Sequence, residues 1–164
     1  MDDVFSPILD TGKEMLSDAV LALNAKTDRD DDTLWLPLVV HLRDTAEVME
    51  YLLRHWLPEQ YCEGLDLSRE EFFRLALFIA LVHDIGKATP FFQRKVTQRQ
   101  ETLRYRLEKN GLTDQGIALE KEPPHAAAGA EILRAEGVAE CVAAVVGAHH
   151  GMPEQVRISS FSEE

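Results

Sequence analysis

The chain has few of the features that mark secreted and membrane proteins. Its 164 residues include two cysteines, Cys62 and Cys141, and these form no CxxC motif and no disulfide-rich spacing. No apolar stretch reaches the roughly 18 residues that cross a bilayer, because Asp84 interrupts the longest run. The N-terminus is acidic and lacks the basic-then-apolar order of a secretory signal. These absences predict a protein of the reducing cytoplasm without a membrane partner.

Positive charge is scarce as well. The chain has 17 lysine and arginine residues against 29 aspartate and glutamate residues, which gives a net charge of −12. Tight binding of nucleic acid depends largely on contacts between basic side chains and phosphates. The balance therefore counts against a domain that holds DNA through a broad basic surface. It does not exclude a nuclease, because bound divalent cations or a neighbouring domain can supply positive charge locally.

Apolar residues spaced three and four apart fill most of the chain and predict helices. The segments with this spacing are residues 6–23, 36–57, 69–84, 89–111 (one or two helices), 125–137 and 138–151. The polar, acidic stretch 24–33 is expected to be an exposed loop, and residues 112–124 are expected to form another. No strand alternation, internal repeat or low-complexity segment is evident. A single all-α domain over residues 1–164 is the expected fold class.

The segment 69–84 is expected to be the central buried helix. Ser68 with Glu71 three residues later forms a capping-box pattern at its start. Residues 72–82 are apolar nearly all round, which is typical of a helix enclosed on every side. Gly86 follows, at a position where a helix C-terminus commonly needs a residue that tolerates positive φ.

Five of the six histidines occupy apolar-facing or helix-terminal positions. His41 lies on one stripe of segment 36–57 with Thr45, Val48 and Leu52, and this stripe is expected to face inward. The remaining candidates stand at predicted helix ends, and they are His83 with Asp84, His125, and His149 with His150. His55, beside Trp56 at the exposed end of its helix, is assigned no functional role.

These residue types in this arrangement predict a metal site. Imidazole and carboxylate together suit Mn, Fe, Co, Ni or Zn, and helix C-termini favour cations. A buried, unpaired Asp84 would be costly, so it needs a partner or a cation. Taken singly, an inward histidine is more often a hydrogen-bonded core residue, and a histidine pair before a glycine is often only a helix end. The occurrence of five such histidines together with an aspartate in an otherwise apolar helix favours a metal site over these structural explanations.

A carboxylate such as Asp84 has two oxygens and can bridge two ions. Two ions about 3.5–4 Å apart are a known device for in-line attack on a phosphodiester. Lys87, which follows the His83–Asp84 pair by one turn, is expected to place a further cation near the phosphate.

Four stretches carry a family resemblance: "HLRDTAEVMEYL", "ALVHDIGKATPFFQRK", "PHAAAGAEIL" and "VVGAHHGMP". The order H…HD…H…HH is similar to the HD superfamily of metal-dependent phosphohydrolases. The stretches "HDIGKATPFFQ" and "GAHHG" restrict the resemblance to one family within this superfamily. They resemble the HD nuclease domain of the CRISPR-associated nuclease–helicase of type I systems. The resemblance runs from about Leu36 to Pro153, most of the chain.

The resemblance implies an HD-type helical bundle and a set of metal ligands, which are His41, His83, Asp84, His125, His149 and His150. It implies that Asp84 bridges two divalent ions (Mn, Ni, Co or Fe, with Mg as an alternative) and that Lys87 is the lysine that follows the dyad. The implied activity is two-metal cleavage of single-stranded DNA in antiviral defence. The implied partners are a helicase portion and the RNA-guided surveillance complex.

The chain departs from the family pattern in two ways. The family has a further metal-ligating aspartate downstream of the paired histidines, whereas here Glu154, Glu163 and Glu164 are the only carboxylates after His150. There is also no GxxxxGK[ST] motif of a helicase. We expect the chain to be the first part of a longer nuclease–helicase. Because the aspartate lacks a counterpart, we expect the stronger metal position to be the one with the paired histidines and His125.

Two other functions fit the same residues. One is a phosphohydrolase of small nucleotides or cyclic dinucleotides, and the other is a non-catalytic interaction module. The segment 90–106 contains Phe91, Phe92, Arg94, Lys95, Arg99, Arg104 and Arg106. It would guide a DNA strand by stacking and charge. The alternative interpretation, equally favoured by the sequence, is that the phenylalanines are core residues and the charged side chains form a solvent-exposed face.

Overall fold

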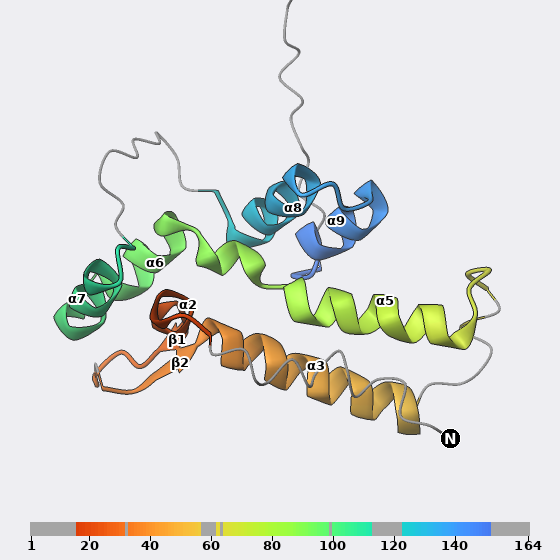
Figure 1. The fold of residues 1–164 in the computed structure, drawn as a ribbon, viewed down its shortest axis with the longest axis horizontal. Coiled ribbons are helices and arrows are strands. Elements are labelled where there is room, and N and C mark those ends of the chain that lie inside the picture. The colour runs from red at the N-terminus through yellow and green to blue at the C-terminus, as the bar shows by residue number, and fades with distance from the viewer. Residues whose placement is uncertain are drawn as a thin grey trace, which may run out of the picture.

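The computed structural model describes residues 16–31, 33–56, 62, 64–98, 100–112 and 123–151. Helices dominate these residues and a two-stranded sheet is the only sheet among them, which confirms the all-α prediction (Figure 1). The first part of the predicted helix 6–23 lies outside the described residues. Its end is the short helix α2 (Asp18–Ala22), for which the Ser17 side chain is the N-cap.

The expected loop over 24–33 is wrong at its start. Strand β1 (Asn24–Thr27) pairs antiparallel with β2 (Trp35–Pro37), with a register shift between Asn24 and Lys26. These strands are too short for a period-two pattern to be evident in the sequence. The acidic residues that follow do form the exposed turn, where the Asp28 carboxylate accepts hydrogen bonds from the backbone N–H groups of Asp30 and Asp31.

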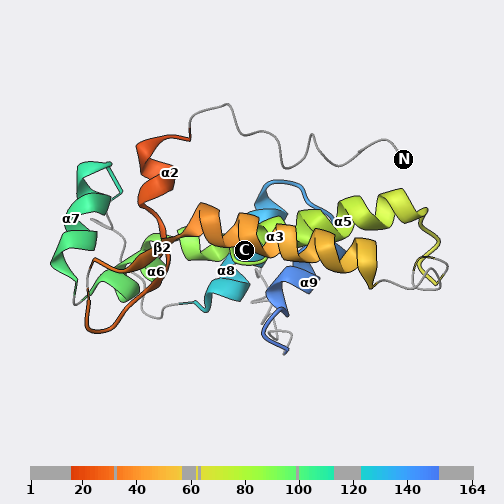
Figure 2. The ribbon, with the colours of Figure 1, turned by 90° about the horizontal axis from the view of Figure 1, so that it is seen from below.

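Helices α3 (Leu38–His55) and α5 (Arg69–Val82) lie side by side and run in opposite directions (Figures 1 and 2). The predicted capping box at the start of α5 is confirmed: the Ser68 hydroxyl accepts from the Glu71 N–H, and the Glu71 carboxylate accepts from the Ser68 N–H. Leu53 of α3 packs with Phe73 and Leu77 of α5 in a shared core. Burial of these side chains stabilises the pairing of the two helices.

The inward stripe predicted for α3 is only partly correct. His41 and Thr45 are partly buried, but Val48 is 59% exposed and Leu52 is 39% exposed. The side chains that α3 buries are Leu38, Leu42, Ala46 and Leu53. Leu38 and Leu42 pack with Ala25 of β1, and Leu53 packs with residues of α5. The real apolar face is therefore rotated by one residue from the predicted stripe. His41 lies at its border.

Helix α5 is central, as predicted, with α3 on one side and the pair α8 (His125–Ala135) and α9 (Glu140–Gly147) on the other (Figure 1). After α5 the chain continues into the short 3₁₀ helix η1 (Ile85–Ala88), which packs against α8. Helices α6 (Pro90–Thr97) and α7 (Glu101–Lys109) then lead away towards the hairpin. The predicted segment 89–111 is thus two helices, and Gly111 follows them at φ +74°.

Gly86 serves close packing and does not adopt the positive φ expected of it. The described glycines with positive φ are Gly111, Gly137 and Gly151. A Cβ atom on Gly86 would instead lie 1.9 Å from the carbonyl oxygen of His125 and 2.5 Å from the backbone nitrogen of Gly129. Only glycine permits this approach of η1 to α8. The contact brings the residues after α5 next to the first residue of α8.

Within the described part of the chain, no single helix is both long and apolar enough to cross a membrane. The α5–η1 segment and α6 meet these criteria only when taken together, and they are bent by 69° relative to each other.

Candidate metal centre

The predicted ligands come from four separate places in the chain and meet at one point. His41 is in the first turn of α3, and His83 and Asp84 follow the last residue of α5. The first residue of α8 is His125, while His149 and His150 follow the end of α9. Two groups form, each with its candidate ligand atoms within 4.8 Å of one another: His41, His83 and Asp84, and Asp84, His125, His149 and His150. Asp84 is common to both.

The two oxygens of Asp84 face different groups. Oδ2 lies 2.8 Å from His41 Nε2, 3.3 Å from His83 Nε2 and 2.6 Å from the Lys87 ammonium nitrogen. Oδ1 lies 3.2 Å from His125 Nε2 and 3.3 Å from His149 Nε2. His150 reaches the second group through its Nε2, which is 2.9 Å from His125 Nε2. The carboxylate therefore has a geometry that can bridge two cations.

The ends of α5 and α9 orient their histidines by the same device. His83 Nδ1 donates to the carbonyl oxygen of Ala80 at 2.8 Å, and His149 Nδ1 donates to that of Val146 at 2.7 Å. Both acceptors are carbonyls of a last helical turn, where the regular helical donors run out. The Val146 carbonyl also accepts from the backbone N–H of His149 at 3.3 Å. Because a carbonyl can only accept, the proton of each neutral ring is on Nδ1 and the lone pair is on Nε2. Both lone pairs point towards Asp84.

Buried polar atoms at the centre give a test of whether the residues suit a cation. Asp84 is 4% exposed, and its Oδ1 and His149 Nε2 have no hydrogen-bond partner among the described residues. They are only 3.3 Å apart, but two lone pairs cannot hydrogen-bond to each other. Leaving such atoms unsatisfied is costly, and a cation bound between them would satisfy both. Imidazole and carboxylate are also ligands suited to divalent transition metals, so the residues fit the implied ions.

The protonation states agree with this assignment. Burial lowers the pKa of His125 to about 4, so its ring is neutral at pH 7 and can donate its lone pair to a metal. Burial by itself would raise the pKa of Asp84, but hydrogen bonds from His83 and Lys87, together with the Lys87 charge, lower it well below its usual range. Asp84 is therefore an anion at neutral pH. The hydrogen bond to Asp84 raises the pKa of His83, because the protonated ring donates from Nε2 to Oδ2 as well as from Nδ1 to the Ala80 carbonyl. The lone pair on Nε2 belongs to the neutral ring, which is the form that would bind a metal.

Lys87, for which the sequence predicts a place near the phosphate, lies within the cluster of candidate ligands. It is 9% exposed, its ammonium contacts Asp84, and the same nitrogen lies 5.6 Å above the Phe92 ring. Phe92 also meets His125 edge-on, with 5.5 Å between ring centroids. His55, which was assigned no role, lies apart from the cluster and stacks against Tyr51.

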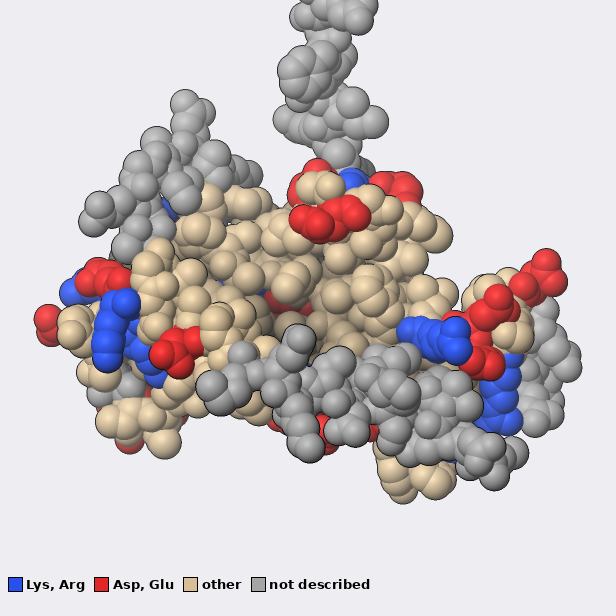
Figure 3. All heavy atoms as spheres, in the orientation of Figure 1, with Lys and Arg blue, Asp and Glu red and all other residues tan. Residues whose placement is uncertain are grey.

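The remaining side chains of segment 90–106 are mostly engaged in the fold. Arg106 stacks on Trp35, 3.2 Å from its ring centroid, and donates to Asn24 Oδ1. Arg104 lies 4.0 Å from the Glu108 carboxylate. Arg99 lies outside the described residues. On the face drawn in Figure 3, charged side chains gather at both ends and over α8 and α9, and its described residues form no broad basic patch.

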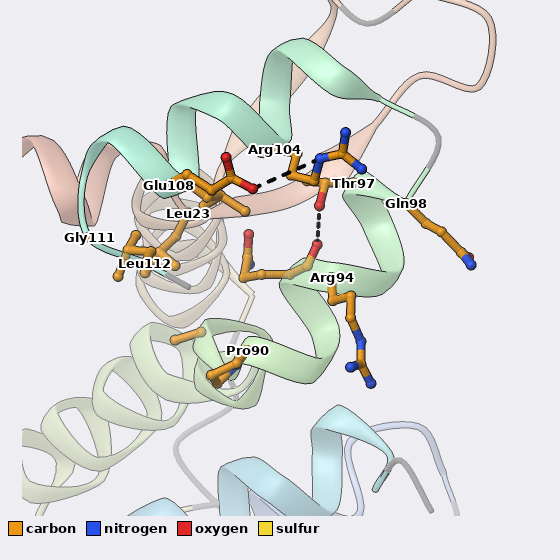
Figure 4. A pocket seen from close by; sticks show the side chains of 12 residues that line it. Leu23, Pro90, Arg94, Thr97, Gln98, Arg104, Glu108, Gly111 and Leu112 are labelled. Carbon is orange, nitrogen blue, oxygen red and sulfur yellow. Dashed lines mark hydrogen bonds and ion pairs between the residues drawn. The ribbon is translucent and has the colours of Figure 1, made fainter. Parts of the chain in front are cut away.

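A cavity of about 410 Å³ lies between α6 and α7, away from the histidine cluster (Figure 4). Pro90, Arg94, Thr97, Arg104 and Glu108 are among its lining residues, and no candidate metal ligand is. The chemistry of the cluster, rather than the size of this cavity, identifies the candidate site.

A family model described as "Cas3, HD domain" matches residues 25–163 of the chain. The chain belongs to this family. The matched range contains all six candidate ligands, and the assignment confirms the resemblance carried by the four sequence stretches.

Curated relatives and a solved structure agree with the assignment to the Cas3 HD family. The "CRISPR-associated nuclease/helicase Cas3" of Streptococcus thermophilus is 36% identical over 143 residues, covering 78% of this chain. The "CRISPR-associated endonuclease/helicase Cas3" of Thermus thermophilus is 32% identical over 153 residues, covering 84%. The chain spans 15% of the length of each relative. A crystal structure of a CRISPR-associated protein matches with a TM-score of 0.68 and 27% identity, over 92% of this chain and 18% of that one.

Proposed function

We propose that this HD domain is a metal-dependent nuclease that cleaves single-stranded DNA in the cytoplasm as part of CRISPR antiviral defence. The supporting observation is the Asp84 carboxylate, whose two oxygens face two histidine groups. In this proposal the domain is the first part of a nuclease–helicase. The helicase portion delivers the strand after recruitment by the RNA-guided surveillance complex. The names of the two curated relatives, which are a nuclease/helicase and an endonuclease/helicase, support the helicase partner.

The metal ions would be held by the six clustered residues, with Asp84 shared between two positions. Ions of this kind supply Lewis-acid polarisation of a phosphoryl oxygen and make water a competent nucleophile near neutral pH. The chain's own residues prepare the site for them. The carbonyls of Ala80 and Val146 hold two imidazoles in the tautomer that presents Nε2, and Lys87 supplies a fixed positive charge beside the carboxylate.

We predict that the group with His125 binds the first ion. The Lys87 ammonium already neutralises Oδ2, whereas Oδ1 lacks a partner among the described residues. His150→Ala should therefore weaken the tighter binding event at least about 10-fold, and His41→Ala should leave it nearly unchanged. Calorimetric titration with Mn²⁺ or Ni²⁺ measures both. His55→Ala is the control, since this exposed ring lies outside the cluster. If His41→Ala alone lost the tighter binding event, the group with His41 and not the group with His125 would bind the first ion.

The nuclease itself is tested with circular single-stranded DNA. We expect the chain to nick the circle with added Mn²⁺, Ni²⁺ or Co²⁺, with Mg²⁺ as a further arm, and not after chelation. Asp84→Ala should abolish nicking, because both positions lose their shared ligand. Gel electrophoresis separates nicked from closed circles. A parallel incubation contains nucleoside triphosphates and cyclic dinucleotides.

The same assay separates the alternatives. Hydrolysis of nucleotides with intact DNA would favour a small-molecule phosphohydrolase. Absence of both activities at every metal would favour an interaction module.

A further inference from the structure

A continuous series of polar contacts, mostly buried, links α7 and the hairpin to the metal centre. It runs from Arg106 through Asn24, Gln93 and Lys87 to Asp84. Asn24 is fully buried, Gln93 is 4% exposed and Lys87 is 9% exposed. Such residues need complete hydrogen bonding, because an unsatisfied group is costly in this environment. The side chain at the middle of the series is the amide of Gln93.

Gln93 uses every hydrogen-bonding position of its amide. Its Oε1 accepts from the backbone N–H of Asn24 at 2.9 Å and from the Asn24 side chain at 3.0 Å. Its Nε2 donates to the carbonyl oxygen of Asn24 at 2.9 Å and to that of Lys87 at 2.7 Å. The opposite orientation of the amide would place donors against donors, so the network admits one arrangement.

The bond to the Lys87 carbonyl satisfies a group that the local backbone leaves without a donor. In a 3₁₀ helix each carbonyl accepts from the N–H three residues later. Three residues after Lys87 stands Pro90, which has no N–H. Gln93, one turn further along α6, supplies the missing donor from its side chain. The stretch KATPFFQ therefore contains both Pro90, which removes the backbone donor for the Lys87 carbonyl, and Gln93, whose side chain replaces that donor.

We propose that Gln93 is a positioning residue of the metal centre. Its amide fixes the backbone of η1 at Lys87, and the fixed backbone holds the Lys87 ammonium on Asp84. The effect on catalysis rests on the nuclease function proposed above, whereas the effect on the position of Lys87 does not. The sequence stretch that suggested a DNA-guiding surface thus contains a residue that acts from inside the fold.

The test compares Gln93→Met with Thr97→Val. Methionine fills a similar volume without the hydrogen bonds, whereas alanine would leave space for water next to the cavity that Gln93 lines. Thr97 is one turn further along α6 and is 2% exposed, and its hydroxyl bonds to the backbone carbonyl of Gln93, not to η1. It controls for losing a buried polar group from the same helix.

The first readout is the ¹H–¹⁵N signal of the Lys87 ammonium group, assigned by its absence in Lys87→Met. This measurement needs neither metal nor DNA. A buried, ion-paired ammonium exchanges slowly enough to be observed. We expect the signal in the parent chain and in Thr97→Val, and its loss in Gln93→Met. Persistence of the signal unchanged in Gln93→Met would overturn the proposal.

The second readout is nicking, with folding checked by circular dichroism. Gln93→Met should lower the rate by about 10–100-fold, as for other residues that orient a metal centre, and Thr97→Val should not. In a Lys87→Met background, Gln93→Met should have almost no further effect, because both changes act through the same ammonium. Multiplied losses in the double variant would contradict a role through Lys87. If no variant or parent nicks DNA but the ammonium signal behaves as expected, the nuclease proposal fails and the positioning role stands.

Discussion

Gly86→Ala is expected to cost on the order of 3 kcal/mol of unfolding free energy or more, and to remove metal binding. The added Cβ would lie 1.9 Å from the His125 carbonyl oxygen and 2.5 Å from the Gly129 nitrogen, and both are backbone atoms that cannot rotate away. Relief requires η1 and α8 to separate. That separation moves Asp84 away from His125, which is one of the contacts that build the second ligand group.

The measurement pairs urea unfolding with metal titration of the same preparation. Gly64→Ala is the matched control, because nothing lies within 4 Å of a Cβ at Gly64 and its φ is not positive. Its unfolding free energy should change by less than about 1 kcal/mol. A Gly86→Ala chain that is as stable as the parent and still binds metal would show that the close approach of η1 to α8 is not required.

The candidate site was predictable because its chemistry sits at helix ends. His83, Asp84 and His149 follow runs of apolar residues whose helical spacing is clear, so the positions of these side chains at helix ends follow from the pattern. The capping box at Ser68 was predictable for the same reason, since it depends on residues three apart.

The features that could not be predicted depend on contacts between distant residues. Asn24 and Gln93 are 69 positions apart in the sequence. The side-chain amide of Gln93 hydrogen-bonds to both backbone groups of Asn24 in β1, as a neighbouring strand would. The local sequence predicts that Gly86 ends a helix with positive φ. Only the position of α8 shows that the residue is a glycine because η1 packs closely against α8. The buried face of α3 is set by β1 and α5, which the spacing of its own apolar residues does not specify.

Asp84→Asn is expected to destabilise the metal-free chain by about 3–5 kcal/mol and to abolish nicking. The substitution keeps the shape of the side chain but removes the charge that compensates the buried Lys87 ammonium 2.6 Å away. Loss of one partner of a buried pair is costly because the other charge remains desolvated. Unfolding in urea with a chelator present measures this cost without any contribution from bound ions, and the circular-DNA assay measures nicking.

The double variant Asp84→Asn with Lys87→Met separates folding from chemistry. Methionine retains much of the lysine's apolar stem and removes its charge, so the double variant should recover most of the stability that Asp84→Asn loses. It should still fail to bind metal tightly, because neither ligand group has its carboxylate. Recovery of stability without recovery of metal binding would identify Asp84 as a residue that the fold tolerates only as part of a charged cluster. If the double variant is no more stable than Asp84→Asn, the cost comes instead from the histidines around the carboxylate, and the pairing with Lys87 is not what stabilises this centre.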